Sequence, residues 1–269
     1  MRLDRLAPLG GVVLLAAVAL GCNKLKARDQ LNKGVASFRN AQFQQAINHF
    51  QNAVELDPTL LNARLYLATA YFQLYVPSGD SEDNIKIGKQ AIAAYEDVLH
   101  RDPSNTNAIA SIAQIYYNMK EFDKAKEYQR RRIQIEPNNP EPYYWIGVID
   151  WAVCYPKRMQ VRKDLNIANP VDPKKPGILP PLPEKARAKL AEDNGPLLDD
   201  GIQALDKAIQ LKPNDANAMT YLNLMFREKA DLEADAKDRD ADLEKADDLI
   251  QKALGIKKQE QAAASAAVR

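Results

Sequence analysis

Few residues of this sequence have types and spacings that could carry out chemistry. Its two cysteines, Cys22 and Cys154, and its two histidines, His49 and His100, are too few for a disulfide framework or for most metal sites. No Ser-His-Asp order, phosphate loop, HExxH motif or CxxC motif occurs. Cys154 stands close to Trp151 and to apolar residues, which favours a buried thiol over a nucleophile. We therefore expect a chain that is not an enzyme and that binds no cofactor and no metal.

The N-terminus has the form of a secretory signal. Two arginines precede an apolar run, residues 6–20, which ends at Gly21 and Cys22. This run of about 15 residues is shorter than the roughly 20 that a membrane-spanning helix needs. Gly21 directly before Cys22 resembles the bacterial lipobox, in which the signal is cleaved ahead of a cysteine that becomes diacylated. Ala19 and Leu20 depart from that pattern, because they stand in the reverse of the usual order. An ordinary cleaved signal and an uncleaved short anchor are the alternatives.

The resemblance to a lipoprotein predicts that the protein is located at a membrane. We expect a signal peptide over residues 1–21, lipidation of Cys22, and a short linker over residues 22–26 that reaches about 14 Å when extended. Two acyl chains supply the stable anchoring that one chain does not. Asn23 is not the aspartate that favours inner-membrane retention in enterobacterial lipoproteins. The predicted location is therefore the bacterial envelope, lipid-anchored at the outer membrane and facing the periplasm.

An internal repeat indicates the fold. Four segments end alike, in a helix stopped by proline, at Pro58, Pro103, Pro137 and Pro213. Counting back from the first proline places small and aromatic residues where a 34-residue tetratricopeptide repeat has them: Gly34, Phe43, Ala46, Phe50 and Ala53. Residues 27–260 resemble that family. The resemblance implies an all-α, right-handed solenoid of about five helix pairs and a disordered tail over residues 261–269. The expected repeats are 27–60, 61–105, 106–139, 140–215 and 216–260.

The repeats are not equally long, and the extra residues are all expected between the two helices of a pair. The intervals between successive prolines are 45, 34 and 76 residues, and the last repeat adds about 11 more. Residues 74–84 read as a surface loop. Residues 166–196 hold seven prolines and read as an extended insertion in the fourth repeat, with a short helix over residues 184–192. Residues 231–241 lack Gly and Pro, so both helices of the fifth pair are expected to run longer.

In the family that this sequence resembles, the first helices line a concave groove. The twelfth residue of each of the first four repeats is aromatic. Amide side chains occur at two other groove positions, near the start of the first helix and directly after the aromatic residue. These ligand-groove candidates are Phe38, Phe72, Tyr117 and Trp151, with Asn62, Asn107, Gln73 and Asn118. The aromatic residues could form a ladder for a ligand, or they could pack between neighbouring first helices. Asn62, Asn107 and Asn217 stand near helix starts, where capping is the commoner role.

One groove chemistry known in the family is not expected here. The carboxylate clamp, which holds a chaperone tail, needs Lys, Asn and Arg at defined positions. The matching positions hold Leu31, Val35, Tyr66, Asn107 and Ser111, of which only Asn107 could serve.

Two segments of opposite charge are predicted to attract each other. Residues 157–189 contain nine basic and three acidic residues, and residues 231–248 contain nine acidic and three basic ones. Their pairing would fold the long insertion back onto the stack. The alternatives are two separately solvated faces, because exposed ion pairs contribute only about 0–1 kcal/mol, and binding of the basic segment to anionic lipid.

Composition limits the class of partner. The chain has 37 Lys and Arg residues against 36 Asp and Glu residues, so no net field attracts nucleic acid. We therefore expect a non-catalytic scaffold for protein–protein interaction, anchored to a bacterial envelope membrane, which binds proteins or peptides by the groove and by the insertion edge in envelope assembly or secretion. The alternative is a periplasmic carrier that binds a peptide or glycan in an aromatic-lined groove.

Overall fold

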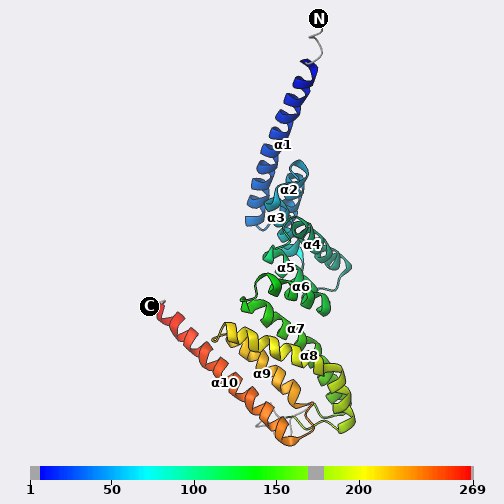
Figure 1. Cartoon of the computed structure of the whole chain (residues 1–269), viewed down its shortest axis with the longest axis vertical. Helices are drawn as coiled ribbons and strands as arrows, with labels where there is room; N and C mark the ends of the chain where they lie inside the picture. The colour runs from blue at the N-terminus through cyan, green and yellow to red at the C-terminus, as the bar shows by residue number, and fades with distance from the viewer. Residues whose placement is uncertain (1–6, 169–178, 268–269) are drawn as a thin grey trace. The chain divides into compact units, whose positions relative to one another are not determined.

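The computed structural model of the chain describes residues 7–168 and 179–267, with side chains from residue 22 to residue 266 within those ranges (Figure 1). Over this part of the chain the regular elements are ten helices and no strand. They are α1 (Ala7–Arg39), α2 (Phe43–Leu56), α3 (Leu61–Leu74), α4 (Glu82–Arg101), α5 (Thr106–Asn118), α6 (Phe122–Ile135), α7 (Pro140–Asp164), α8 (Glu184–Leu211), α9 (Ala216–Ala230) and α10 (Ala236–Ala267). The predicted all-α class is confirmed.

The helices follow the predicted repeat register. The expected starts of the second to fifth repeats coincide with the first residues of α3, α5, α7 and α9. The chain forms two compact units, Met1–Glu121 and Phe122–Arg269, so the boundary falls between α5 and α6. In the first unit α1 packs on α2, and α3 packs on α4; in the second, α7 packs on α8, and α9 on α10 (Figure 1). Within each unit the stacked pairs form the solenoid layers that the repeat predicts.

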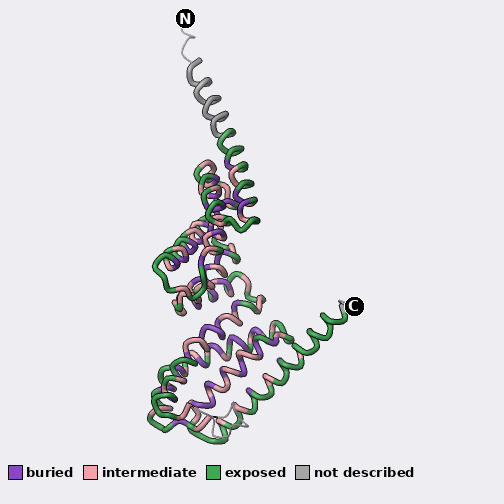
Figure 2. Tube along the Cα trace, turned by 180° about the vertical axis from the view of Figure 1, so that it is seen from behind, coloured by how far each residue is buried: buried purple, intermediate pink, exposed green. Residues whose placement is uncertain are grey.

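Small residues allow the paired helices to approach closely. A Cβ atom added to Gly34 of α1 would overlap the ring of Phe50 in α2, and one added to Gly147 of α7 would overlap Leu205 in α8. In the first unit Phe50 is fully buried with Ala46 of the same helix. The core of each unit therefore lies along the seams between helices, where Figure 2 shows the buried residues.

The first insertion is a short loop followed by a longer helix. The loop occupies residues 75–81, and α4 contains 20 residues where α2 contains 14. Asn84 holds the loop through its side chain, which accepts from the backbone N–H of Val76 and donates to the carbonyls of Val76 and Gly79, each at 2.8 Å. The predicted surface loop therefore exists, but it ends earlier than residue 84.

The second insertion is more helical than predicted. α7 runs to Asp164, and α8 begins at Glu184 and continues through Pro196 to Leu211. The predicted short helix over residues 184–192 is the start of this long helix, and the prediction that the chain after residue 192 is extended as far as residue 196 was wrong. A proline removes one helical hydrogen bond, and burial of α8 against α7 outweighs that loss. Pro170, Pro173 and Pro176 lie outside the described residues.

The C-terminal predictions were wrong in two respects. α9 ends at Ala230, residues 231–235 form a turn, and α10 alone takes up most of the extra length. α10 then continues to Ala267, where a disordered tail was expected from residue 261. Its last turns are rich in alanine, which has the highest helix propensity, and their side chains are exposed. Residues 268–269 lie outside the described range.

α1 also differs from the expected linker. It begins at Ala7 and runs without a break into the first repeat, so residues 22–26 are helical and not extended. Within the described ranges we find no helix with the length and apolar character that crossing a membrane requires.

Candidate functional site

The predicted aromatic positions are half-buried, three in the first unit and one in the second. Phe38, Phe72 and Tyr117 belong to α1, α3 and α5, and Trp151 belongs to α7. The ring of Phe38 meets that of Phe43 edge-on, with centroids 5.3 Å apart. In the first unit, therefore, at least Phe38 contributes to packing between paired helices.

Trp151 packs between neighbouring first helices. Its ring stacks on Tyr155 with centroids 5.0 Å apart, and it meets Tyr221 of α9 edge-on at 5.6 Å. It also borders the core cluster that contains Leu205 and Met225. This geometry favours the packing alternative over an open ladder at this position.

The predicted amide positions lie near solvent, and the capping alternative given for Asn62, Asn107 and Asn217 was wrong. Asn62, Asn107 and Gln73 are exposed, while half-buried Asn118 accepts from the Gln114 side chain at 3.2 Å. The caps are instead the residues just before each helix. Asn105 accepts from the N–H of Ala108 at the start of α5, and Asp215 caps α9. Leu60, before α3, provides no side-chain cap. Asn107 and Asn217 each stand two residues after the capping residue, inside the first turn, which is too late to cap.

A buried ionic cluster joins α7 to the end of α9. Arg162 is fully buried and donates to both carboxylate oxygens of Asp231, with Nε–Oδ2 at 2.9 Å and an Nη2–Oδ1 distance of 2.5 Å. Arg158 also donates to Asp231, at 2.8 Å, and its Nε lies 2.8 Å from a carboxylate oxygen of Glu228. Burial raises the pKa of Glu228 to about 7, against the opposing pull of Arg158. The predicted attraction between the two charged segments is thus concentrated in one carboxylate, Asp231.

The same cluster fixes the described ends of the insertion. Arg162 donates to the carbonyl of Pro180 at 2.9 Å and to that of Ile167 at 3.3 Å. Arg239 of α10 donates to the carbonyl of Leu179 at 2.5 Å. Other acids of the acidic segment pair locally, as Asp242 does with lysines of α9 and α10. Basic residues Lys174 and Lys175 lie outside the described residues.

A second buried cluster joins α6, α7 and α8. The ammonium of Lys126 contacts the fully buried carboxylate of Asp150, and it lies 3.0 Å from Asp200. Arg130 also pairs with Asp200, at 2.8 Å. Burial raises the pKa of Asp150 to about 6, against the effect of Lys126. Both ionic clusters have the geometry of structural ion pairs, because their opposite charges face each other, and only the Arg130–Asp200 pair of the second cluster reaches solvent.

An apolar groove lies where the fourth-repeat insertion extends α7 and α8. It has a volume of about 790 Å³ and opens to solvent. Leu190, only 3% exposed, lies at its base, whereas Leu165 at its edge is 40% exposed. The lining residues are Pro156, Lys157, Gln160, Val161, Asp164, Leu165, Pro183, Lys185, Ala186, Lys189, Leu190 and Asp193. We call this surface the insertion groove.

The insertion groove was not predicted, because the insertion over residues 166–196 was expected to be extended apart from a short helix over residues 184–192, and that helix was not expected to pack along the end of α7. A signal was present in the sequence. Val161 and Leu165, and likewise Ala186 and Leu190, are apolar pairs four residues apart, which lie on one face if both segments are helical. The prolines of the insertion outweighed that signal.

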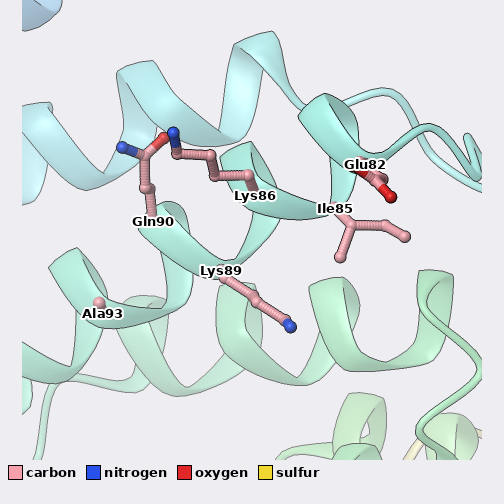
Figure 3. A pocket seen from close by; sticks show the side chains of 6 residues that line it. All are labelled: Glu82, Ile85, Lys86, Lys89, Gln90 and Ala93. Carbon is pink, nitrogen blue, oxygen red and sulfur yellow. The ribbon is translucent and has the colours of Figure 1, made fainter.

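A smaller pocket lies against α4 in the first unit. It has a volume of about 500 Å³ and is lined by Glu82, Ile85, Lys86, Lys89, Gln90 and Ala93. Figure 3 shows Ile85 beside Lys89, and Lys86 beside Gln90, along the helix. Ile85 is its only large apolar side chain, so this surface is a weaker candidate than the insertion groove.

The two cysteines differ as predicted in their surroundings. Cys22 is exposed on α1, whereas Cys154 is fully buried between α7 and α8. Burial raises the pKa of the Cys154 thiol to about 12, and the nearby carboxylates of Glu228 and Asp150 add to the rise. A thiol with that pKa is a poor nucleophile at neutral pH. Among the described residues, no group of His, Cys, Asp and Glu side chains is arranged to hold a metal ion.

Comparisons with known proteins agree with the repeat. Residues 88–146 match the tetratricopeptide repeat family. The chain is 26% identical over 115 residues to the Hsp70-Hsp90 organizing protein 3 of Arabidopsis thaliana and to the Hsp70-Hsp90 organizing protein of Triticum aestivum. These matches cover 43% of this chain but only 19% and 18% of the relatives, so the chain spans about a fifth of the length of the curated proteins it matches.

Solved structures resemble the fold over most of the chain. A MamA structure from Desulfovibrio magneticus RS-1 covers 87% of this chain and 96% of its own, with a TM-score of 0.55 and 15% identity. YrrB, described as a TPR protein with an unusual peptide-binding site, covers 90% of this chain and 97% of its own, with a TM-score of 0.51 and 16% identity. At these identities the likeness establishes the fold alone. The family match shows that residues 88–146 are tetratricopeptide repeats, and the repeat register extends the same pattern along the all-α fold.

Proposed function

We propose that this chain is a non-catalytic scaffold that binds other proteins through the insertion edge of its fourth repeat, with the concave groove as a secondary surface. The observation that carries the proposal is the insertion groove. An apolar surface left open to water on a folded protein is typical of a protein-binding site. Leu165, 40% exposed at the groove edge, is the clearest such residue.

We also propose that acylated Cys22 anchors the scaffold to a bacterial envelope membrane, on the periplasmic side of the outer membrane. The exposure of Cys22 supports this, because the processing enzymes need access to its thiol. Helical residues 22–26 would span only about 6 Å, less than half the reach of an extended linker. The stack would therefore stand directly on the membrane surface, where assembly or secretion partners are found.

We do not propose that this chain binds chaperones, although it is similar to Hsp70-Hsp90 organizing proteins. The positions that would form a carboxylate clamp hold Leu31, Val35, Tyr66, Asn107 and Ser111, and these offer one amide and no cation. The carrier alternative, with a peptide or glycan on an aromatic ladder, has less support, because Tyr155 stacks on the ring of Trp151 and Tyr221 meets that ring edge-on.

The anchoring is tested by metabolic labelling with palmitate and by membrane fractionation of the native chain. We expect label in the chain and recovery with the outer membrane. Cys22→Ser should abolish both, whereas Cys154→Ala, which removes the other cysteine, should change neither. Unlabelled native chain, or membrane recovery of Cys22→Ser, would contradict the anchor.

The scaffold role is tested by chemical crosslinking in native membranes followed by mass spectrometry. We expect a reproducible set of partner proteins on the native chain. Partners crosslinked as often to an unrelated lipoprotein of equal abundance would refute the role.

A further inference from the structure

The insertion groove is a trough between two antiparallel helical walls. Residues 156–165, at the end of α7 and just beyond it, form one wall, and residues 183–193, Pro183 and the start of α8, form the other. At one end the side chain of Asn194 donates to the carbonyl of Cys154 at 3.2 Å, which fixes α8 against α7. At a rise of 1.5 Å per residue, walls of about ten residues make a trough about 15 Å long. That length matches about three turns of an added helix.

The trough is held in shape from behind. The opposite face of α7 carries Arg158 and Arg162, which are bound to Asp231 and Glu228. Leu190 at the base is buried, so the floor is part of the core. A ligand would therefore meet a preformed surface and would lose little affinity to ordering of the walls.

The charged side chains that border the trough indicate what kind of ligand it binds. Lys157, Lys185 and Lys189 border it, and in the described part of the chain none of them forms an ion pair. Of the two bordering acids, Asp164 accepts a hydrogen bond from Gln160 at 2.7 Å. By contrast, the two arginines on the hidden face of α7 are neutralised. The open rim thus carries three lysines that have no ion-pair partner among the described residues.

The positions of the lysines discriminate between kinds of ligand. Lys157 stands beside Pro156 at one end of the trough, and Lys185 stands beside Pro183 at the other, with Lys189 between. A small amphiphile with one anionic head would need cations gathered at one end. A helix with carboxylates along both flanks needs them spread along the length, as they are here. Its apolar side chains, at i, i+3 or i+4 and i+7, would cover Val161 and Leu165.

We propose that the insertion groove docks an amphipathic helix of a partner protein, of about ten residues, with one apolar stripe flanked by Asp and Glu. This inference rests on the proposed scaffold function and names the surface and the chemistry of its partner. Electrostatic complementarity of this kind sets specificity and association rate, while the apolar stripe supplies most of the contact area.

The test uses two synthetic 14-residue helical peptides with the same leucine stripe, one flanked by glutamates and one by lysines. Binding to the full chain is measured by fluorescence anisotropy at low salt. We expect saturable binding of the acidic peptide at one site, at least tenfold tighter than that of the basic peptide. Equal affinity for both peptides, or binding of neither, would overturn the proposal.

Reversing the charge of the rim lysines tests whether the peptide binds in the insertion groove. The triple variant Lys157→Glu, Lys185→Glu and Lys189→Glu should lose the acidic peptide by at least tenfold and should gain the basic one. The matched control reverses three exposed lysines of α10, Lys252, Lys257 and Lys258, and should leave both affinities unchanged. The gain for the basic peptide shows that the groove variant is folded. An equal effect of both triple variants would mean that the net charge of the whole chain attracts the peptide and that the peptide does not bind in the insertion groove.

Failure of this inference is separable from failure of the scaffold role. If the acidic peptide does not bind but membrane crosslinking still finds partners that the groove variant retains, docking occurs elsewhere on the scaffold. If anionic vesicles of phosphatidylglycerol compete with the acidic peptide while neutral vesicles do not, and no partner protein is lost with the groove variant, the rim binds lipid and the proposal is wrong.

Discussion

Arg162→Met is the perturbation that the second unit should tolerate least. Methionine keeps most of the volume of the side chain but removes the charge that Asp231 needs. Removing one partner of a buried ion pair costs roughly 3–5 kcal/mol, because the other charge stays buried and unpaired. Arg158 still bonds Asp231 at 2.8 Å, which places the loss at the lower end, about 3 kcal/mol. The carbonyls of Pro180 and Ile167 also lose a donor.

The assay is hydrogen exchange, combined with urea unfolding of the full chain. Peptides from α7, the start of α8 and the end of α9 should exchange about 100-fold faster in Arg162→Met, since about 1.4 kcal/mol corresponds to a factor of ten. The matched control is Lys163→Met, which removes a charge from the neighbouring exposed residue. Exchange in the first unit should stay unchanged in both variants.

A second substitution tests the reasoning itself. Replacing both partners of a buried pair by apolar residues is often neutral. Arg162→Met with Asp231→Leu should therefore recover a large part of the lost protection. The account is refuted if Arg162→Met lies within about 0.5 kcal/mol of Lys163→Met, the range of ordinary surface substitutions.

Three further predictions concern titration, packing and thiol reactivity. The folded pKa of Glu228, about 7, lies above its ordinary value, so its protonation stabilises the fold at low pH, and that contribution is lost as pH rises through 7. The urea midpoint of the second unit should fall between pH 5 and pH 8, and Glu228→Gln should flatten the dependence; an unchanged slope in the variant would contradict this. Gly147→Ala should cost about 1–3 kcal/mol by overlap with the facing leucine of α8, whereas Gly255→Ala, which meets no neighbour, should be neutral or stabilising by about 1 kcal/mol in thermal unfolding. Iodoacetamide should alkylate Cys22 of unlipidated chain and leave Cys154 unmodified, as read by mass spectrometry, and modification of Cys154 in the folded chain would show that α7 and α8 separate.

The repeat register could be predicted from sequence because it depends on local rules. Proline ends a helix wherever the chain is exposed, and Gly34 or Ala46 marks a close helix contact without reference to distant residues. For that reason the starts of α3, α5, α7 and α9 fall where the proline intervals place them.

The i, i+4 apolar pairs in the walls of the insertion groove are visible in the sequence, but the groove itself could not be predicted, because the way its two walls face each other depends on contacts between distant residues. Pro196 argues locally against a helix, and only packing of α8 on α7, with Asn194 bonded to Cys154, overrides it. Similarly, the pairing of Arg162 with Asp231 joins residues 69 positions apart in the sequence. Charge counts predicted that the two segments attract, but not which carboxylate would be buried.

The most direct test of the central claim, that the fourth-repeat insertion recognises a partner protein, is site-specific photocrosslinking in native cells. A photoreactive residue at Ala186, inside the insertion groove, is compared with one at Ala262, exposed on α10. The account predicts that Ala186 alone crosslinks a defined peptide of a partner, and that this peptide has an apolar stripe flanked by acidic residues. Crosslinks of equal yield from both positions, or a crosslinked peptide without acidic flanks, would contradict it.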